Sequence, residues 1–114
     1  MTAEPSPLTV DTQSAAAEAK DTSEALWISL RGEADVTNLH QLQAALSRIE
    51  LDGVGVVRIR LSELIFCDTQ AFRQLFAFAQ EVQHNGHVVF VHDASDVVRQ
   101  LVILLAAQDT LKLA

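Results

Sequence analysis

The residues best placed to do chemistry lie at one junction, where an apolar run over residues 64–67 gives way to a helical pattern. The polar pair Asp68 and Thr69 occupies this junction. Four backbone N–H groups at a helix start lack helical partners, and the helix dipole favours negative charge there. Either residue is therefore a candidate N-cap. A second interpretation stays open, in which the Thr69 hydroxyl is displayed at the carboxyl end of a strand, where open α/β sheets place their functional sites.

The other candidate catalytic residues are weaker. Glu33 and Asp35 resemble paired carboxylates, but at a strand-to-helix turn they are more simply a solvated acid and a helix cap. Cys67 has no triad partner in the sequence, and its apolar neighbours Ile65 and Phe66 predict a buried thiol with a raised pKa. We therefore expect no catalytic residues and no enzyme activity.

Recognised metal and cofactor motifs are absent from the sequence. Neither a Cys pair nor an HExxH sequence accompanies the four histidines, so solvated turn histidines are favoured over a zinc site. None of the four glycines begins a phosphate-binding GxGxxG or GxxxxGK sequence. We expect no metal and no cofactor. The histidines are His40, His84, His87 and His92.

Composition and charge limit the class of partner. A chain of 114 residues, 49% of them hydrophobic, is long enough for one domain with its own core. The formal net charge of −7 argues against nucleic acid and anionic membrane surfaces and is compatible with a basic protein partner. A single cysteine predicts a reducing compartment, and we find no signal-peptide pattern. The most apolar run, residues 101–107, is too short to span a bilayer, so we expect a cytoplasmic protein without direct membrane insertion.

Hydrophobic periodicity predicts alternating strands and helices, which implies a parallel or mixed sheet with right-handed crossovers. Strands are expected over 25–31, 54–61 and 88–91, helices over 36–49, 69–84 and 97–107, and a last edge strand over 111–113. We expect the third helix, over 97–107, to be buried over more than half its circumference, with Ile103 and Ala106 as a candidate contact surface.

The N-terminal residues differ from the rest in composition. They are rich in Ala, Ser, Thr, Glu and Pro and offer few large apolar side chains to offset the entropy of ordering. We therefore divide the chain into a flexible arm over 1–23, dispensable for folding, and a domain over 24–114. An edge strand over residues 7–12, which includes Leu8 and Val10, is left open as an exception.

Four short motifs follow the predicted elements in order. They are GEAD after the first strand, LS at the end of the second, FCDT opening the second helix, and the run over 93–101 leading into the third helix. Together, over roughly residues 25–113, they resemble the STAS domain, the fold of bacterial anti-sigma-factor antagonists. The resemblance implies an α/β fold with a mixed four- to five-stranded sheet and about three helices.

The resemblance also implies a function. In the family, a Ser or Thr follows the aspartate at the end of the family's third strand; here that residue is Thr69. A kinase-type anti-sigma factor phosphorylates this Ser or Thr, and a phosphatase removes the phosphate. The unphosphorylated antagonist binds the anti-sigma factor and frees the sigma factor. Homodimer formation is left open. We expect the partner-binding residues to be Asp68, Thr69, Gln70, Glu33 and Asp35.

This sequence departs from the family's Asp-Ser-Ser-Gly pattern. The second Ser is Gln70, the Gly is Ala71, and the acidic residue often found before Leu-Ser is Arg60. The Asp-Thr form is more like the stressosome-type members, which serve the stress response. Two alternatives therefore stay open, namely a STAS subunit of a membrane transport complex and a degenerate stressosome-type scaffold.

Overall fold

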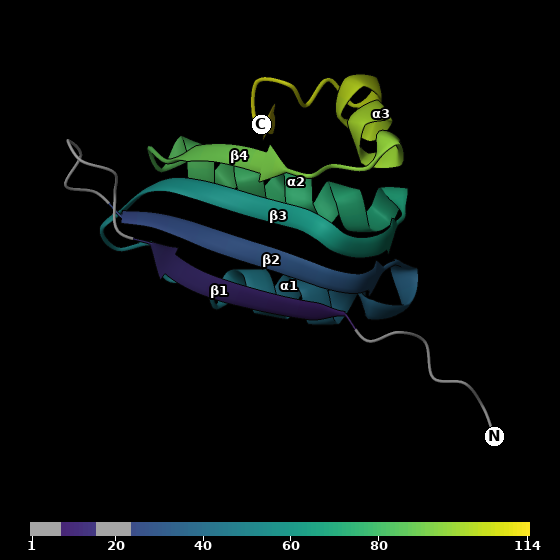
Figure 1. Cartoon of the computed structure of the whole chain (residues 1–114), viewed down its shortest axis with the longest axis horizontal. Helices are drawn as coiled ribbons and strands as arrows, with labels where there is room; N and C mark the ends of the chain where they lie inside the picture. The colour runs from purple at the N-terminus through teal and green to yellow at the C-terminus, as the bar shows by residue number, and fades with distance from the viewer. Residues whose placement is uncertain (1–7, 16–23) are drawn as a thin grey trace.

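A five-stranded mixed sheet organises the chain, in the order β1-β2-β3-β4-β5 (Figure 1). The computed structural model describes residues 8–15 and 24–114. β1 is antiparallel to β2, and the remaining neighbours are parallel. This confirms the predicted α/β class and the mixed sheet. The strands are β1 (Thr9–Ala15), β2 (Glu24–Ala34), β3 (Val54–Cys67), β4 (Val88–His92) and β5 (Lys112–Leu113).

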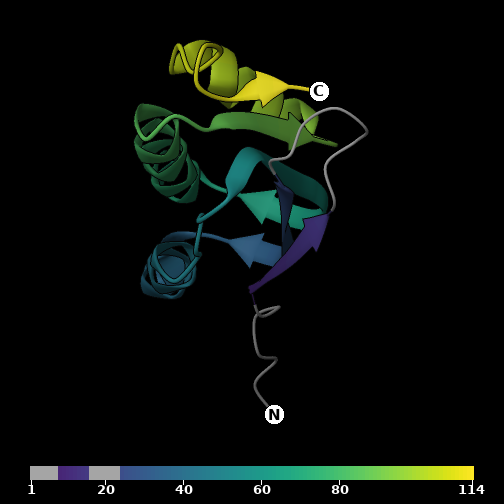
Figure 2. The same cartoon turned by 90° about the vertical axis from the view of Figure 1, so that its left-hand side faces the viewer.

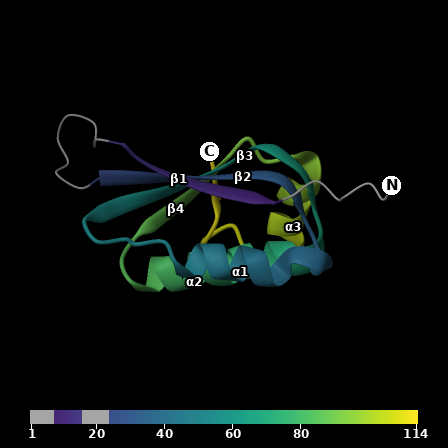
Figure 3. The ribbon, with the colours of Figure 1, turned by 90° about the horizontal axis from the view of Figure 1, so that it is seen from below.

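Two helices cover one face of the sheet. α1 (Leu39–Ser47), which follows the 3-10 turn η1 (Val36–Asn38), packs beside α2 (Thr69–His84) in a single layer (Figures 2 and 3). α3 (Asp96–Leu104) sits beyond the β4 edge instead of across the sheet (Figure 1). The face opposite α1 and α2 carries no helix in the described part of the chain (Figure 3). Over residues 8–15 and 24–114 the fold therefore has two layers, and no helix covers the second face of the sheet, which we call the open face.

The core lies between the sheet and the helix layer. Alternate residues of the central strands point into it, as the period of a strand requires. Phe72 on α2 is fully buried and its ring lies 6.4 Å from that of Phe76. The largest fully buried side chains are Phe72, Ile28, Leu30, Leu42, Ile59, Leu111, Val57, Val89, Val91 and Val102.

β2 runs further than the sequence predicts, and β3 joins two predicted stretches. β2 continues through Ala34 instead of ending at Arg31. β3 combines the strand expected over 54–61 and the strand-like apolar run over 64–67 into one strand that ends at Cys67. The ends of the two strands pair with each other, so each supplies the backbone hydrogen bonds that the other needs. Gly32 has a φ of 92° and lies at a shift in the pairing register, a conformation that glycine adopts at little steric cost.

The N-terminal region contains an ordered edge strand. β1 pairs with β2 along its whole length, Leu8 is only 2% exposed, and the Gln41 side chain donates to the Leu8 carbonyl at 2.6 Å. The expectation of a weakly structured arm is wrong for residues 8–15, because Leu8 and the partly buried Val10 bury apolar surface on the core. The alternative strand is confirmed, shifted from 7–12 to 9–15. Residues 1–7 and 16–23 of the expected arm lie outside the described residues.

α3 is shorter and more exposed than predicted. It ends at Leu104, and only Val98 and Val102 of its side chains are buried, while Val97 is 58% exposed and Leu104 76%. The prediction of a helix buried over more than half its circumference is wrong, because a helix at the edge of the sheet presents only one narrow stripe to the core. Ile103 is 63% exposed, as expected.

The first helical segment also differs from its predicted stripe. The helix predicted over 36–49 opens instead as the 3-10 turn, in which Val36 is 64% exposed, and α1 ends at Ser47. The 3-10 turn rotates its side chains away from the stripe that Leu42 and Leu46 form one and two turns later.

Candidate functional site

The predicted junction between β3 and α2 is observed, and Asp68 is its cap. Asp68 has extended backbone angles, and its Oδ1 accepts a hydrogen bond from the Ala71 N–H at 2.8 Å. Thr69 is the first residue of the helix and its side chain is exposed. Of the two candidate caps, the structure thus selects Asp68. The Thr69 hydroxyl lies beside the cap and makes no hydrogen bond to the residues that the structure describes.

The second carboxylate oxygen of Asp68 reaches another turn. Its Oδ2 accepts from the Val36 N–H at 2.9 Å, and the Asp68 N–H donates to the Ala34 carbonyl at 3.1 Å. Asp68 therefore joins the end of β2 to the end of β3. Because both strands are parallel, their carboxyl ends meet at one edge of the sheet (Figure 1).

Asp35 begins η1 by a reciprocal capping box. Its Oδ1 accepts from the Thr37 N–H at 2.8 Å, and the Asp35 N–H donates to the Asn38 Oδ1 at 2.9 Å. The prediction that Asp35 caps the first helical segment is confirmed. Asn38, which also donates from Nδ2 to the Glu33 carbonyl at 2.7 Å, was missed by the sequence analysis. Its signal was the Asp-x-x-Asn spacing, a variant of the capping-box pattern.

The predicted partner-binding residues come together at this edge of the sheet. Asp35 and Asp68 flank Val36, whose N–H donates to Asp68. Thr69 and Gln70 are exposed on the first turn of α2. Glu33 is half-buried and aligns with Phe66 across the β2–β3 pair, further back along the strand. We name Asp35, Asp68, Thr69 and Gln70 the switch surface. Its role in binding stays a prediction.

Exposed apolar side chains border the switch surface. Ile65 is 75% exposed and Phe66 50%, so the burial predicted for Cys67 does not extend to its two apolar neighbours. With Leu64 and Val97 they line a shallow cavity of about 150 Å³ between the end of β3 and the start of α3. β3 pairs with β4 only as far as Arg60, which leaves this end of the strand open on the α3 side.

Cys67 is buried, as predicted. It is 8% exposed, and its Sγ lies 3.6 Å from the Asp68 carbonyl oxygen. Burial, followed by the nearby charge of Asp68, raises the pKa of the Cys67 thiol to about 12. A neutral, buried thiol of this kind is a poor nucleophile.

Two of the histidines, His87 and His92, make hydrogen-bond contacts at separate positions. The His87 Nδ1 lies 2.6 Å from the Val54 carbonyl, and the His92 Nε2 lies 3.1 Å from the Arg58 Nη1. Across residues 8–15 and 24–114, no three His, Cys, Asp or Glu side chains are grouped as metal ligands would be. None of the described helices is long and apolar enough to cross a membrane.

Comparison with known proteins identifies the family. A family model for the STAS domain matches residues 16–114. Comparison with curated proteins gave no match. The fold is also similar to solved structures of two kinds of protein, anti-sigma factor antagonists and a sulfate transporter family protein.

The first is the anti-sigma factor antagonist SpoIIAA in its unphosphorylated form, which is also solved in the phosphorylated form as a Bacillus cell fate determinant. The unphosphorylated form is 16% identical, with a TM-score of 0.65 over 95% of this chain and 88% of SpoIIAA. The second is an anti-sigma factor antagonist from Mycobacterium paratuberculosis, 18% identical, with a TM-score of 0.68 over 92% of this chain and 85% of that one.

The third is a sulfate transporter family protein from Wolinella succinogenes, 14% identical, with a TM-score of 0.61 over 84% of each chain. At these identities the likeness establishes the fold and not the partner. The family model covers most of the chain, including the whole of β2, β3, α2 and the switch surface. The chain therefore belongs to the STAS domain family.

Proposed function

We propose that this protein is an anti-sigma-factor antagonist that binds a kinase-type anti-sigma factor and is regulated by phosphorylation at Thr69. The observation that carries the proposal is that two neighbouring residues at the start of α2 have different roles: Asp68 caps the helix and Thr69 does not. Asp68 makes the cap bond to Ala71, and the exposed Thr69 hydroxyl beside it has no structural bond to lose within the described residues. A kinase can therefore modify Thr69 without dismantling the helix start.

The local electrostatics suit a switch. A phosphate on Thr69 adds about −1.5 to −2 charges, and the unsatisfied N–H groups and dipole of the helix start favour it. Asp68 and Asp35, which share this edge of the sheet, oppose it on the surface that a partner would meet. Phosphorylation thus changes the surface charge strongly while the fold survives.

The surroundings of Thr69 also suit a protein partner. Protein interfaces combine an apolar centre with a polar rim, and the exposed Ile65, Phe66 and Val36 lie beside the switch surface. A phosphate brought against such apolar side chains would have to be desolvated without a paired cation. The unphosphorylated form should therefore bind the anti-sigma factor, and the phosphorylated form should release it.

Phosphate transfer tests this proposal. The wild type, Thr69→Ala, Thr69→Glu and the control Ser62→Ala, an exposed serine further back on β3, are incubated with the co-purified anti-sigma factor and radiolabelled ATP. We expect label on the wild type and Ser62→Ala and its removal by the cognate phosphatase. Thr69→Ala should bind without label, and Thr69→Glu should bind at least tenfold more weakly. Equal binding by both Thr69 variants, or label at another residue, would contradict the assignment.

The likeness to a sulfate transporter family protein supports one alternative, a STAS subunit of a membrane transport complex. Affinity purification of the full chain from its native cell separates the two. A kinase-type anti-sigma factor among the stoichiometric partners supports the first proposal, and a transport ATPase or permease supports the alternative. Stable binding of the anti-sigma factor without label on Thr69 would instead indicate a degenerate scaffold.

A further inference from the structure

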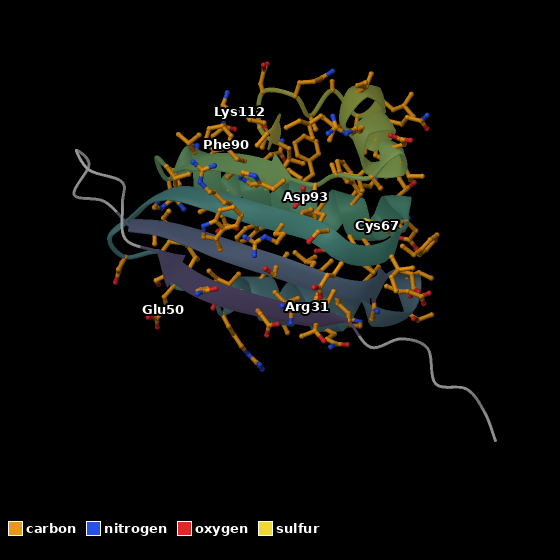
Figure 4. All side chains as sticks on the ribbon, in the orientation of Figure 1. Arg31, Glu50, Cys67, Phe90, Asp93 and Lys112 are labelled. Carbon is orange, nitrogen blue, oxygen red and sulfur yellow. The ribbon has the colours of Figure 1, made fainter. Side chains whose placement is uncertain are left out.

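The open face of the sheet carries a row of basic and aromatic side chains. The pairing register places Trp27 of β2, Arg58 of β3, Phe90 of β4 and Lys112 of β5 side by side across four strands. Arg60 and His92 form the next pair on the same face, two residues along. Figure 4, which looks onto this face, shows Phe90 and Lys112 close together near its β4–β5 edge. We name Trp27, Arg58, Arg60, Phe90, His92 and Lys112 the arginine–aromatic row.

The two arginines lie against the aromatic rings. The Arg60 guanidinium carbon is 4.3 Å from the centre of the Trp27 ring, and that of Arg58 is 5.8 Å from Trp27 and 5.0 Å from Phe90. Such cation–π contacts hold a long side chain in place and lower the entropy lost when it binds. Arginine keeps its N–H groups at the edge of a planar fork, which matches a carboxylate with two parallel hydrogen bonds.

Arg58 and Arg60 also have no carboxylate partner among residues 8–15 and 24–114. Acidic residues outnumber Lys and Arg by 15 to 8 in the sequence. Arg31, on the same face, is paired with Asp11 at 3.0 Å and Glu63 at 2.7 Å. Within the described residues, neither Arg58 nor Arg60 has a carboxylate oxygen within 4.0 Å. Among the described residues, two adjacent guanidinium groups therefore stand without a carboxylate partner on an acidic protein.

His92 does not compensate their charge. Its Nε2 lies 3.1 Å from the Arg58 Nη1, and burial followed by the Arg58 charge lowers the His92 pKa, with Asp93 acting in the opposite direction. A neutral imidazole can accept the Arg58 hydrogen bond, so this contact positions the guanidinium without neutralising it.

We propose that the arginine–aromatic row is a docking surface for an acidic segment of a partner protein, whose carboxylates pair with Arg58 and Arg60. Tryptophan and arginine are the residues that most often dominate protein interfaces. Arg58 and Arg60 are two positions apart on β3, a spacing of about 6.6 Å. An extended peptide with acidic residues at alternate positions presents carboxylates at the same spacing.

Two other ligand classes fit this face less well. Single-stranded nucleic acid binds by stacking bases on open aromatic rings, but Trp27 already contacts both arginines and lies 4.7 Å from the His92 ring, and the net charge repels a polyanion. A small organic ligand needs a pocket of about 300 Å³ or more. The hollow beside Arg60 measures about 40 Å³, close to the room for one water or one carboxylate.

The arginine–aromatic row is separate from the switch surface. Arg60 lies seven residues before Cys67 on β3, about 23 Å of extended chain away from the strand end. The proposed phosphorylation of Thr69 and the proposed peptide binding by the arginine–aromatic row can therefore be tested independently. Phosphorylation of Thr69 can be absent while the arginine–aromatic row binds its partner, and the reverse also holds.

Trp27 is the only tryptophan of the chain, so its fluorescence reports on this surface directly. The full chain is titrated with a capped hexapeptide of alternating Glu and Ser, with the same peptide carrying Gln for Glu, and with octathymidylate. We expect a saturable change in Trp27 emission with the Glu peptide that weakens as salt rises, and no saturable change with the Gln peptide. Tighter binding of octathymidylate than of the Glu peptide would overturn the proposal in favour of nucleic acid.

Charge-matched variants locate the binding. The double variant Arg58→Gln/Arg60→Gln should weaken Glu-peptide binding at least tenfold, while Arg48→Gln, an exposed arginine at the end of α1, should change it less than twofold. Circular dichroism checks the fold. Because Arg58 is half-buried, Arg60→Gln alone serves if the double variant unfolds, and it should weaken binding at least threefold. Unchanged binding in Arg60→Gln, or self-association of the wild type that the variant abolishes, would refute an acidic partner segment.

Discussion

Asp68 should be the most sensitive polar residue of the switch surface, because its carboxylate serves two elements at once. Asp68→Ala removes the cap bond to Ala71, at 2.8 Å, and the bond from the Val36 N–H, at 2.9 Å. Thr69→Ala removes neither. The two neighbouring substitutions therefore separate the structural residue from the one proposed for modification.

The magnitude follows from the two bonds. Loss of a helix cap costs about 1 kcal/mol, within a range of about 0.5–2 kcal/mol. The Val36 bond is exposed to solvent, so its loss costs about 1 kcal/mol, less than the about 1.5–3 kcal/mol of a shielded bond to a charged group. Asp68→Ala should therefore reduce the free energy of unfolding by about 2 kcal/mol, or about 8 °C in Tm for a domain of this size. Thr69→Ala should change it by less than about 0.5 kcal/mol, since Ala suits a helix better than Thr.

Urea unfolding followed by circular dichroism and by Trp27 fluorescence measures these values. Asp68→Asn should lie between the two, because Asn caps helices well but has only one carbonyl oxygen to offer. The control Asp52→Ala removes an exposed acid without a described bond and should change stability by less than about 0.5 kcal/mol. A loss in Thr69→Ala as large as that in Asp68→Ala would refute the assignment of the cap.

Three further predictions concern other parts of the fold. Cys67, with its pKa raised to about 12, should react with a thiol reagent at pH 8 roughly a thousandfold more slowly in the folded chain than in urea; comparable rates would contradict its burial. The His92 pKa is lowered on folding, so the unfolded chain binds more protons as pH falls through about 6.5 and stability should drop there; His92→Gln should flatten this slope in urea titrations at a series of pH values. Leu8→Ala should cost about 2–4 kcal/mol, since Leu8 is 2% exposed, whereas a loss below about 0.5 kcal/mol would restore the view of the N-terminal region as dispensable.

Features set by neighbouring residues could be predicted from the sequence. The alternation of strands and helices, the Asp35 cap and the polar junction at Asp68 and Thr69 all depend on residues within one or two turns. The sequence also predicted the burial of Cys67 and the exposure of Ile103. These are properties of a single element and of its own periodicity.

Features that depend on distant partners could not be predicted in this way. Residues 32–34 read as a turn, yet they form strand because residues 64–67 extend alongside them. The hydrogen bond from the Val36 N–H to Asp68 joins residues 32 positions apart, so no local sequence pattern predicts this bond. The exposure of Leu104 follows from where α3 lies relative to the sheet edge, which is a property of the whole fold.

The strand order bears on how the chain folds during its synthesis. Because the sheet order follows the chain order, each strand that leaves the ribosome meets an existing edge formed by the strand made just before it. No strand has to be inserted between two that already pair. The sheet can therefore grow from β1 towards β5 while translation continues, and at each stage a single newly made strand edge is exposed to aggregation until the next strand covers it.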